Sequence, residues 1–327
     1  MATTFRWGIL GTASICERMV PAIRQHGLQA TERPSRLCAV ASRSPDKARQ
    51  FAQHHSIPLA FSSYGELLAS GEVDAVYVPL PNSLHAEWTV RAVEAGLHVL
   101  CEKPLATTPG EARVIARAAA AAGRIVVEAF MYRHHPVYSQ VLDRIRSGAI
   151  GPVVALDSEF SFLLDEPGSI VASAELGGGA LADVGCYCVS FSRLIAGSEP
   201  SRVTAYASGG EVDDSMVGLL EFPNGILARF FTSIQAAERH RAEIRGTTGT
   251  ILLESPWHPG EASAAFRLQR HGREDEVISV PGADPYVLQV DDFVRACTGS
   301  TPRWPIEDAI ANMEVLEALR QAAGSRR

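Results

Sequence analysis

One lysine and one aspartate–tyrosine pair occupy positions in this chain that favour chemistry. Lys103 follows an apolar strand expected at residues 97–101, and that strand is preceded by another at 75–78 and a helix. Ligands bind at the carboxyl ends of strands in open α/β sheets, so we expect Lys103 at a ligand-binding edge. Asp183 and Tyr187 are four residues apart in a predicted helix, which places both side chains on one helical face.

The turn after the first strand, residues 5–10, is a second chemical signal. Dinucleotide folds use a glycine-rich turn there, so that backbone N–H groups meet a pyrophosphate at a helix N-terminus. Of the three usual glycines only Gly11 is present, and Ala13 and Cys16 replace the others. Small residues at 12–14 still let a phosphate approach closely. Taken alone, this turn fits a nucleotide loop and a plain strand–turn–helix about equally well.

The end of the next strand, at residues 37–41, indicates which dinucleotide is bound. An acidic residue there would bind the adenosine ribose of NAD, but this chain has Ser42 and Arg43. A hydroxyl and a guanidinium suit a 2′-phosphate, because arginine recognises phosphate oxygens through a planar fork. The spacing from Gly11 is longer than usual, and a loop at 27–35 accounts for it. NADP(H) is therefore favoured over NAD(H), and the alternative is an exposed arginine that caps a loop.

Strands and helices alternate over residues 5–129, which predicts an α/β fold with a doubly wound parallel sheet. From residue 153 onward most predicted elements are strands, and residues 222–225 form a predicted hairpin turn between two of them. This order favours a second, α+β domain with a mostly antiparallel sheet. The expected domains are residues 1–129 and 130–327, with a C-terminal helix that can pack back on the first.

Composition narrows the class of protein. A chain of 327 residues with a net charge of −7 is long enough for two domains and lacks the basic surface that nucleic acid or anionic membranes require. No apolar run approaches the length of a membrane span. The chain enters a strand almost at once, leaving no room for a signal peptide, so we expect a cytoplasmic protein.

The six cysteines and ten histidines predict neither disulfides nor a metal site. The sequence has no CxxC pair and no HExxH motif. Cys186 and Cys188 are two residues apart, a spacing that suits neither a zinc knuckle nor an easy disulfide. Buried, reduced thiols are the better interpretation.

Several motifs together resemble the glucose–fructose oxidoreductase, inositol dehydrogenase and rhizopine-catabolism family (Gfo/Idh/MocA). They are Gly8-Ile9-Leu10-Gly11-Thr12-Ala13, Pro79-Leu80-Pro81-Asn82 with His85, Glu102-Lys103-Pro104, Met131-Tyr132-Arg133 and Asp183-Val184-Gly185-Cys186-Tyr187. Tyr187, where many relatives carry histidine, is similar to the dimeric dihydrodiol dehydrogenases and the NADP-dependent xylose dehydrogenases. Ala13 departs from the glycine that is frequent in the family.

The resemblance implies a dinucleotide-binding Rossmann domain at 1–129. It also implies a substrate-binding domain at 130–327 with an open sheet, often used for oligomer contacts. The activity implied is an NADP(H)-dependent dehydrogenase or reductase acting on CH–OH groups of a sugar, cyclic polyol or dihydrodiol. A small-molecule substrate and a homo-oligomer, dimeric or tetrameric, are implied as well. The alternatives are a nucleotide-sugar ketoreductase and a non-catalytic NADP(H)-binding regulator.

A nicotinamide enzyme that oxidises a secondary alcohol must remove the hydroxyl proton as hydride leaves. On this resemblance Tyr187 is the expected general acid/base, because a neighbouring ammonium lowers a phenol pKa. Lys103 would bind the substrate oxygen, and either group can transfer the proton. Asp183 would orient the substrate or hold Lys103, and Arg133 would bind substrate. The competing interpretations are a solvated loop lysine, a core tyrosine and an arginine in a surface ion pair.

The expected cofactor-binding residues come from turns at the carboxyl edge of the first sheet. They are Gly11, Thr12, Ala13, Ser14, Ile15, Ser42, Arg43, Pro79, Leu80, Asn82, His85, Glu102 and Lys103. For His85, a helix-capping or packing role is an equal alternative to contact with the cofactor. Tyr286 and Asp291 are further candidates to line the cleft.

Overall fold

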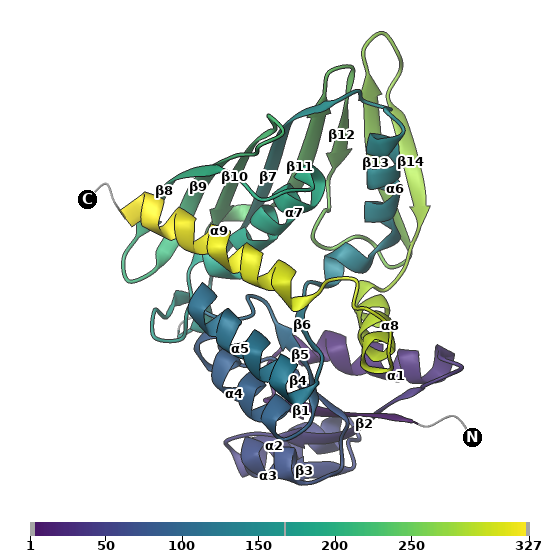
Figure 1. Ribbon diagram of the computed structural model, residues 1–327, viewed down its shortest axis with the longest axis vertical. Coiled ribbons are helices and arrows are strands. Elements are labelled where there is room, and N and C mark those ends of the chain that lie inside the picture. Colours follow the sequence, from purple (N-terminus) through teal and green to yellow (C-terminus); the bar gives the residue numbers. More distant parts are fainter. Residues whose placement is uncertain (1–3, 167, 325–327) are drawn as a thin grey trace. The chain divides into compact units, whose positions relative to one another are not determined.

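The computed structural model describes residues 4–166 and 168–324 (Figure 1). Its contacts divide the chain into two compact units, Met1–Met131 with Tyr286–Ile310 and Tyr132–Pro285 with Ala311–Arg327. The segment Tyr286–Ile310 thus lies in the first unit, whereas the sequence grouped it with residues 130–327. The assignment of cofactor binding to residues 1–129 and substrate binding to 130–327 stays a prediction.

The first unit is built on a six-stranded parallel sheet with the order β3-β2-β1-β4-β5-β6. The strands are β1 Phe5–Leu10, β2 Ser35–Ala41, β3 Leu59–Phe61, β4 Ala75–Val78, β5 His98–Glu102 and β6 Val126–Ala129. The order reverses between β1 and β4, so their carboxyl ends form the topological switch point at which such folds bind ligands. All four residues of β4 are buried, as expected for a parallel sheet covered on both faces.

Helices connect these strands and cover both faces of the sheet. They are α1 Cys16–Gln29, α2 Pro45–His54, α3 Tyr64–Ala69, α4 Asn82–Glu94 and α5 Pro109–Ala122, joined by α8 Pro285–Cys297. Right-handed crossovers from β1 to β2 and from β4 to β5 place α1 and α4 on opposite faces. Helix α8 belongs to this unit because Phe293 packs against Trp7 and Phe5 of β1, with ring centroids 5.1 and 6.3 Å apart.

The second unit contains an eight-stranded sheet with the order β14-β13-β12-β11-β7-β10-β9-β8. The strands are β7 Val153–Leu163, β8 Arg202–Gly209, β9 Asp213–Glu221, β10 Leu227–Ser233, β11 Gln235–Gly246, β12 Gly249–Leu253, β13 Ser263–Arg270 and β14 Glu276–Pro281. Only the pair β7 and β10 is parallel among the pairings of described residues. The predicted combination of a doubly wound sheet with a mostly antiparallel sheet is confirmed.

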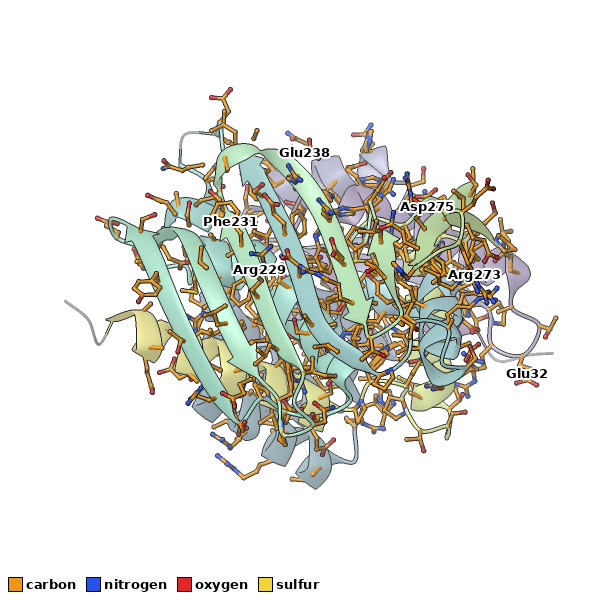
Figure 2. The ribbon with its side chains drawn as sticks, turned by 90° about the horizontal axis from the view of Figure 1, so that it is seen from above. Glu32, Arg229, Phe231, Glu238, Arg273 and Asp275 are labelled. Atoms are coloured by element: carbon orange, nitrogen blue, oxygen red, sulfur yellow. The ribbon has the colours of Figure 1, made fainter. Side chains whose placement is uncertain are left out.

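One face of the second sheet is covered by helices and the other is open. The helical elements are η1 Met131–His134, α6 Pro136–Arg146, η2 Ile170–Ala172, the π-helical turn η3 Leu181–Gly185, α7 Cys186–Ala196 and α9 Ile306–Gly324. Helix α7 contacts β7 and β10 (Figure 1), and nearly all its side chains are buried. Figure 2 looks onto the opposite face, where Arg229 and Phe231 point away from the helices.

Two further features of the described residues bear on the sequence-based expectations. Five of the six cysteines are buried, and Cys297 is half-buried, which agrees with the expectation of buried thiols. None of the described helices combines the length and apolar character needed to cross a membrane.

Candidate functional site

The turn after β1 requires glycine at its first position. Gly11 has a φ of +111°, and a Cβ atom there would lie 3.1 Å from the Leu80 side chain and 3.8 Å from the Pro79 carbonyl oxygen. The Gly11 N–H donates to the carbonyl of Ala41 at the end of β2 (2.8 Å). Gly11, the only glycine of the usual pattern present here, is therefore required by the close contact between the turns that follow β1 and β4.

Helices α1 and α4 begin at the switch point without a side-chain cap. Their N-cap residues are Ile15 and Pro81, and neither provides a capping hydrogen bond. The other strand-connecting helices, α2, α3 and α5, are capped by Ser44, Ser63 and Thr108. A helix N-terminus presents N–H groups and a partial positive charge, which suits an anion. The uncapped starts thus lie where the fold is expected to bind a pyrophosphate.

Ser42 and Arg43 differ in their surroundings at the end of β2. Ser42 is buried, and its hydroxyl accepts a hydrogen bond from the Ser44 N–H (3.2 Å). Arg43 is exposed and lies beside the hydroxyl of Tyr64. Burial raises the pKa of Tyr64, and the hydrogen-bonded Arg43 guanidinium opposes that rise. Helix α2 is capped by Ser44, and the choice between phosphate binding and loop capping for Arg43 stays a prediction.

Two carboxylates, those of Glu102 and Glu128, bind the backbone around Lys103 at the carboxyl end of β5. The Tyr77 hydroxyl donates to Glu102 Oε1 (2.6 Å), and the second oxygen of Glu102 accepts from the Lys103 N–H (3.3 Å). Two residues on, the Leu105 N–H donates to Glu128 Oε1 (2.7 Å). Burial, followed by the Glu102 charge, raises the pKa of Tyr77 well above its usual value, so Tyr77 stays a neutral donor. These bonds fix the backbone from which the lysine side chain extends.

The use of lysine at this position is itself informative. The sequence contains two lysines, Lys47 and Lys103, and every other cationic side chain apart from histidine is an arginine. Lys47 is exposed on α2, whereas Lys103 is half-buried. An ammonium can change its pKa and lose its proton far more readily than a guanidinium. Lys103, which directly follows β5, is therefore better suited to transfer a proton than an arginine at the same position would be.

His85 joins the two turns that carry the expected cofactor residues. Its ring is fully buried, with Nδ1 2.8 Å from the Pro104 carbonyl oxygen and Nε2 2.7 Å from that of Leu80. Burial lowers the pKa of His85, while the two carbonyls oppose the change. Carbonyl oxygens only accept, and a neutral imidazole carries one N–H, so the ring can donate to one of the two carbonyls at a time. The structure favours the packing role for His85, because its ring is enclosed by protein.

Two of the candidate substrate residues of the second unit, Arg133 and Tyr187, are buried, and Asp183 is half-buried. Arg133 is 3% exposed and donates from Nε to the Ser190 hydroxyl (2.8 Å), which lies 2.5 Å from the Tyr132 hydroxyl. This burial excludes the surface ion pair considered for Arg133. Tyr187 is 7% exposed, and its ring lies 5.3 to 5.9 Å from its aromatic neighbours. Those neighbours are Phe160, Tyr132 and Trp257.

Asp183 and Tyr187 lie on one continuous helical segment, but its first turn is not α-helical. Asp183 belongs to the π-helical turn η3, and Tyr187 to α7, which follows directly. The Cys186 N–H donates to the Leu181 carbonyl, five residues back, instead of four. The sequence predicted an ordinary helix here. Wide turns of this kind are frequent at functional sites, because they change the direction of the side chains that they carry.

Other residues near these groups carried weaker sequence signals. Glu128 is a carboxylate in the otherwise apolar strand β6, and that mismatch could have identified it. Tyr286 lies near the start of α1, with the Arg18 guanidinium 5.7 Å from its ring centroid. Asp291 instead faces the last turns of α1, 3.5 Å from Nε2 of His26. Of the two candidates on α8, Tyr286 therefore lies beside the first turn of α1, and Asp291 beside its last turns.

Potential metal ligands cluster at one place among the described residues. Glu17, His54 and His55 bring one ligand atom each to within 4.8 Å of one another. Nε2 of His55 lies 3.0 Å from Glu17 Oε1, so a hydrogen bond between the two side chains already accounts for that contact. None of these three is among the expected site residues.

Comparison with known proteins identifies the family. Residues 5–130 match the oxidoreductase family with an NAD-binding Rossmann fold, Gfo/Idh/MocA, and residues 138–252 match the Gfo/Idh/MocA C-terminal domain. The chain belongs to the Gfo/Idh/MocA family of oxidoreductases. The resemblance inferred from the motifs is thereby confirmed, as is the class of enzyme that it implied.

Individual relatives are similar over most or all of the chain. D-xylose 1-dehydrogenase (NADP(+)) 2 from Haloferax volcanii is 36% identical over 323 residues, 97% of each chain. A trans-1,2-dihydrobenzene-1,2-diol dehydrogenase from Xenopus laevis is 36% identical over 264 residues, covering 79% of this chain and 78% of that protein. The crystal structure of a 3-ketoreductase from Actinomadura kijaniata with NADP and TDP-benzene has a TM-score of 0.92 and 31% identity, with 98% of both chains covered.

The bridging role of His85 can be tested by stability. His85→Leu leaves the carbonyls of Leu80 and Pro104 without their partner, and we expect a loss of about 2 kcal/mol or more in the free energy of unfolding. Urea unfolding measures it. His54→Leu, at an exposed histidine at the end of α2, should change stability by less than about 0.5 kcal/mol. Equal effects of the two substitutions would contradict the bridge.

Proposed function

We propose that this protein is an NADP(H)-dependent oxidoreductase that transfers hydride to or from a secondary alcohol or carbonyl group. Its substrate would be a sugar, a cyclic polyol or a dihydrodiol. The observation that carries the proposal is the switch point between β1 and β4, where two uncapped helices begin and Gly11 permits a close turn. Lys103 directly follows β5, the strand next to β4.

The residues present fit a dinucleotide. The backbone of residues 11–15 and the start of α1 would hold the pyrophosphate, because N–H groups there have no side-chain cap. The turns at 79–82 and 102–103 would hold the nicotinamide half. The bound nucleotide supplies the hydride acceptor or donor. His85 would act indirectly, by keeping the last two turns in place.

Ser42 and Arg43 support NADP(H) over NAD(H). Neither carries the negative charge that repels a 2′-phosphate, and the exposed guanidinium can pair with phosphate oxygens through two N–H groups. NADP stands in the name of the Haloferax volcanii relative and is bound in the Actinomadura kijaniata structure. Both comparisons agree with the choice made from the two residues.

For the chemical step we propose Tyr187 as the general acid/base and Lys103 as the group that binds the reacting oxygen. A phenol surrounded by aromatic rings needs a nearby cation to ionise, and an ammonium is such a cation. Asp183, one helical turn before Tyr187, would orient the substrate or Lys103. Arg133, whose guanidinium is fixed by Ser190, would contribute to substrate binding.

A nucleotide-sugar ketoreductase is the second candidate. The Actinomadura kijaniata 3-ketoreductase favours it, with 98% coverage and a TM-score of 0.92. That enzyme was also solved with a lysine or a tyrosine replaced, in complex with the same two ligands. TDP distinguishes the candidates, because a nucleotide-sugar site should bind it competitively with substrate, whereas a free-sugar site should not. A non-catalytic regulator is disfavoured by the retention of Lys103, Asp183 and Tyr187 together.

We also propose that the protein is a cytoplasmic homo-oligomer assembled through the open face of the second sheet. That face exposes the large apolar side chains Tyr206, Val217, Leu219 and Leu227. Beside them lie arginine–carboxylate pairs such as Arg229 with Asp157 (Figure 2). An apolar surface interspersed with both charges is self-complementary, as a two-fold interface requires.

A screen of the wild-type enzyme with NADP⁺ against sugars, polyols and dihydrodiols first identifies a substrate. The Lys103→Met variant, assayed with that substrate, then tests the catalytic assignment. Loss of the ammonium should lower kcat by about 10²- to 10⁴-fold, because the reacting oxygen loses its charged partner. Absorbance of the reduced nicotinamide follows the reaction. Lys47→Met is the matched control and should leave turnover unchanged. Near-normal turnover of the Lys103 variant would exclude this mechanism.

The cofactor preference is tested by Arg43→Ala. Removing the guanidinium should raise the KM for NADP⁺ by about tenfold or more and leave the KM for NAD⁺ nearly unchanged, since only the former has a 2′-phosphate. Arg49→Ala on α2, whose guanidinium pairs with Asp46, serves as the control. An equal rise in the KM values for NADP⁺ and NAD⁺ would contradict the proposal that Arg43 binds the 2′-phosphate.

Light scattering on a sizing column tests the oligomer. The wild type should show a multiple of 35.1 kDa. Leu219→Asp, in the apolar part of the open face, should shift it toward monomer, because it places an unpaired charge in the contact. Leu28→Asp, at an exposed position on α1, should not. A wild-type monomer would refute the proposal.

A further inference from the structure

The helical segment that carries Asp183 and Tyr187 begins without a cap of its own. Its N-cap residue is Ala180, whose side chain cannot accept a hydrogen bond. The cap comes instead from a strand, because Oδ2 of Asp213 at the start of β9 accepts from the Leu181 N–H (2.6 Å). A carboxylate at this end of a helix also interacts favourably with the helix dipole.

The two glycines before the helix, Gly178 and Gly179, lie too close to neighbouring atoms to carry a side chain. Gly179 has a φ of +109°, and a Cβ atom there would lie 2.3 Å from Oδ1 of Asp213. A Cβ atom at Gly178 would lie 2.2 Å from the Val171 carbonyl oxygen. Any other residue at 179 would displace the carboxylate or the backbone. The approach of Asp213 to the helix start therefore depends on the local sequence.

A second strand fixes the same point. The Thr232 hydroxyl of β10 donates to the Ala180 carbonyl (3.3 Å). A Cβ atom at Gly185 would lie 3.1 Å from the Thr232 methyl group, so the π-helical turn lies directly on this strand. The start of the segment is thus attached to the sheet on successive residues, by the Leu181 N–H and by the Ala180 carbonyl.

The groups around Asp213 indicate that its carboxylate serves as a hydrogen-bond acceptor. Burial raises its pKa, while the bond from the Leu181 N–H and the charge of Arg320 on α9 lower it. The neighbouring Asp214 adds to the rise. The contact requires an acceptor oxygen more than a charge, and an asparagine side chain could supply that oxygen as well.

We propose that Asp213 is a positioning residue, which sets the orientation of Asp183 and Tyr187 by fixing the first turn of their helix to the sheet. The inference rests on the proposed catalytic role of Tyr187. Asp213 acts through the Leu181 N–H, to which its Oδ2 atom is hydrogen-bonded. Catalysis is sensitive to such placement, and a displacement of about 1 Å can cost on the order of 100-fold in rate.

Hydrogen exchange tests the structural part of the proposal in the full-length protein. In Asp213→Ala, the peptide that covers residues 179–185 should exchange faster, because the Leu181 N–H has lost its acceptor. Asp213→Asn keeps an acceptor oxygen and should retain protection. The control is Glu211→Ala, which removes an exposed carboxylate from the same hairpin. Unchanged exchange in Asp213→Ala would overturn the inference.

Turnover tests the catalytic part, with the best substrate from the sugar, polyol and dihydrodiol panel. Asp213→Ala should lower kcat by about ten- to a hundredfold and leave the KM for NADP⁺ within about twofold. Asp213→Asn should restore most of the activity. Equal loss in both variants, or a loss confined to KM, would overturn the positioning role.

Tyr187→Phe separates this inference from the proposed function. If it turns over normally, the role of Tyr187 is wrong, whatever Asp213 does. If Tyr187→Phe is inactive but Asp213→Ala is fully active, the proposed function stands and the positioning role falls. If no substrate is turned over by the wild type, the proposed function fails, and hydrogen exchange alone then decides whether Asp213 fixes the helix.

Discussion

The backbone N–H groups at the starts of α1 and α4 are the constraint on which the first unit depends. Folding leaves such groups without intrahelical partners, and three of the five strand-connecting helices satisfy them with a serine or threonine cap. The two at the switch point have no side-chain cap. A helix start without a side-chain cap leaves room for an anion, which the partial positive charge of the helix N-terminus favours. Gly11 makes this arrangement possible, because a side chain there would separate the turns.

Carboxylates recur as acceptors for backbone N–H groups near the candidate catalytic residues of each unit. Glu102 and Glu128 hold the segment from Lys103 to Leu105, and Asp213 holds Leu181. Glu128 and Asp213 each belong to a different element from the backbone that they bind, whereas Glu102 directly precedes Lys103. Charge-assisted bonds of this kind are stronger than neutral ones, and they orient the neighbouring side chain without contacting it. Rigid placement is what hydride and proton transfer require.

Family membership and these local arrangements support different parts of the functional argument. Membership establishes an oxidoreductase of the Gfo/Idh/MocA type. The chain's own residues give the finer proposals, with Ser42 and Arg43 for the nucleotide, and Lys103 and Tyr187 for the reaction. Relatives act on xylose, on a dihydrodiol and as a 3-ketoreductase, according to their names. The proposed hydride transfer at a CH–OH or carbonyl group is compatible with all three of these names.

The sequence by itself determined the alternation of strands and helices over residues 5–129, the antiparallel region after residue 153, and the family. These follow from periodicity and from motifs that lie close together along the chain. It could not reveal that His85 bridges two carbonyls, that η3 is a π-helical turn, or that α8 packs on β1. Those features and the cap of η3 depend on partners up to 288 positions away along the chain, such as Asp213 for Leu181 and Phe5 for Phe293. Only tertiary packing brings such partners together, because local sequence carries no signal for a contact made by a distant residue.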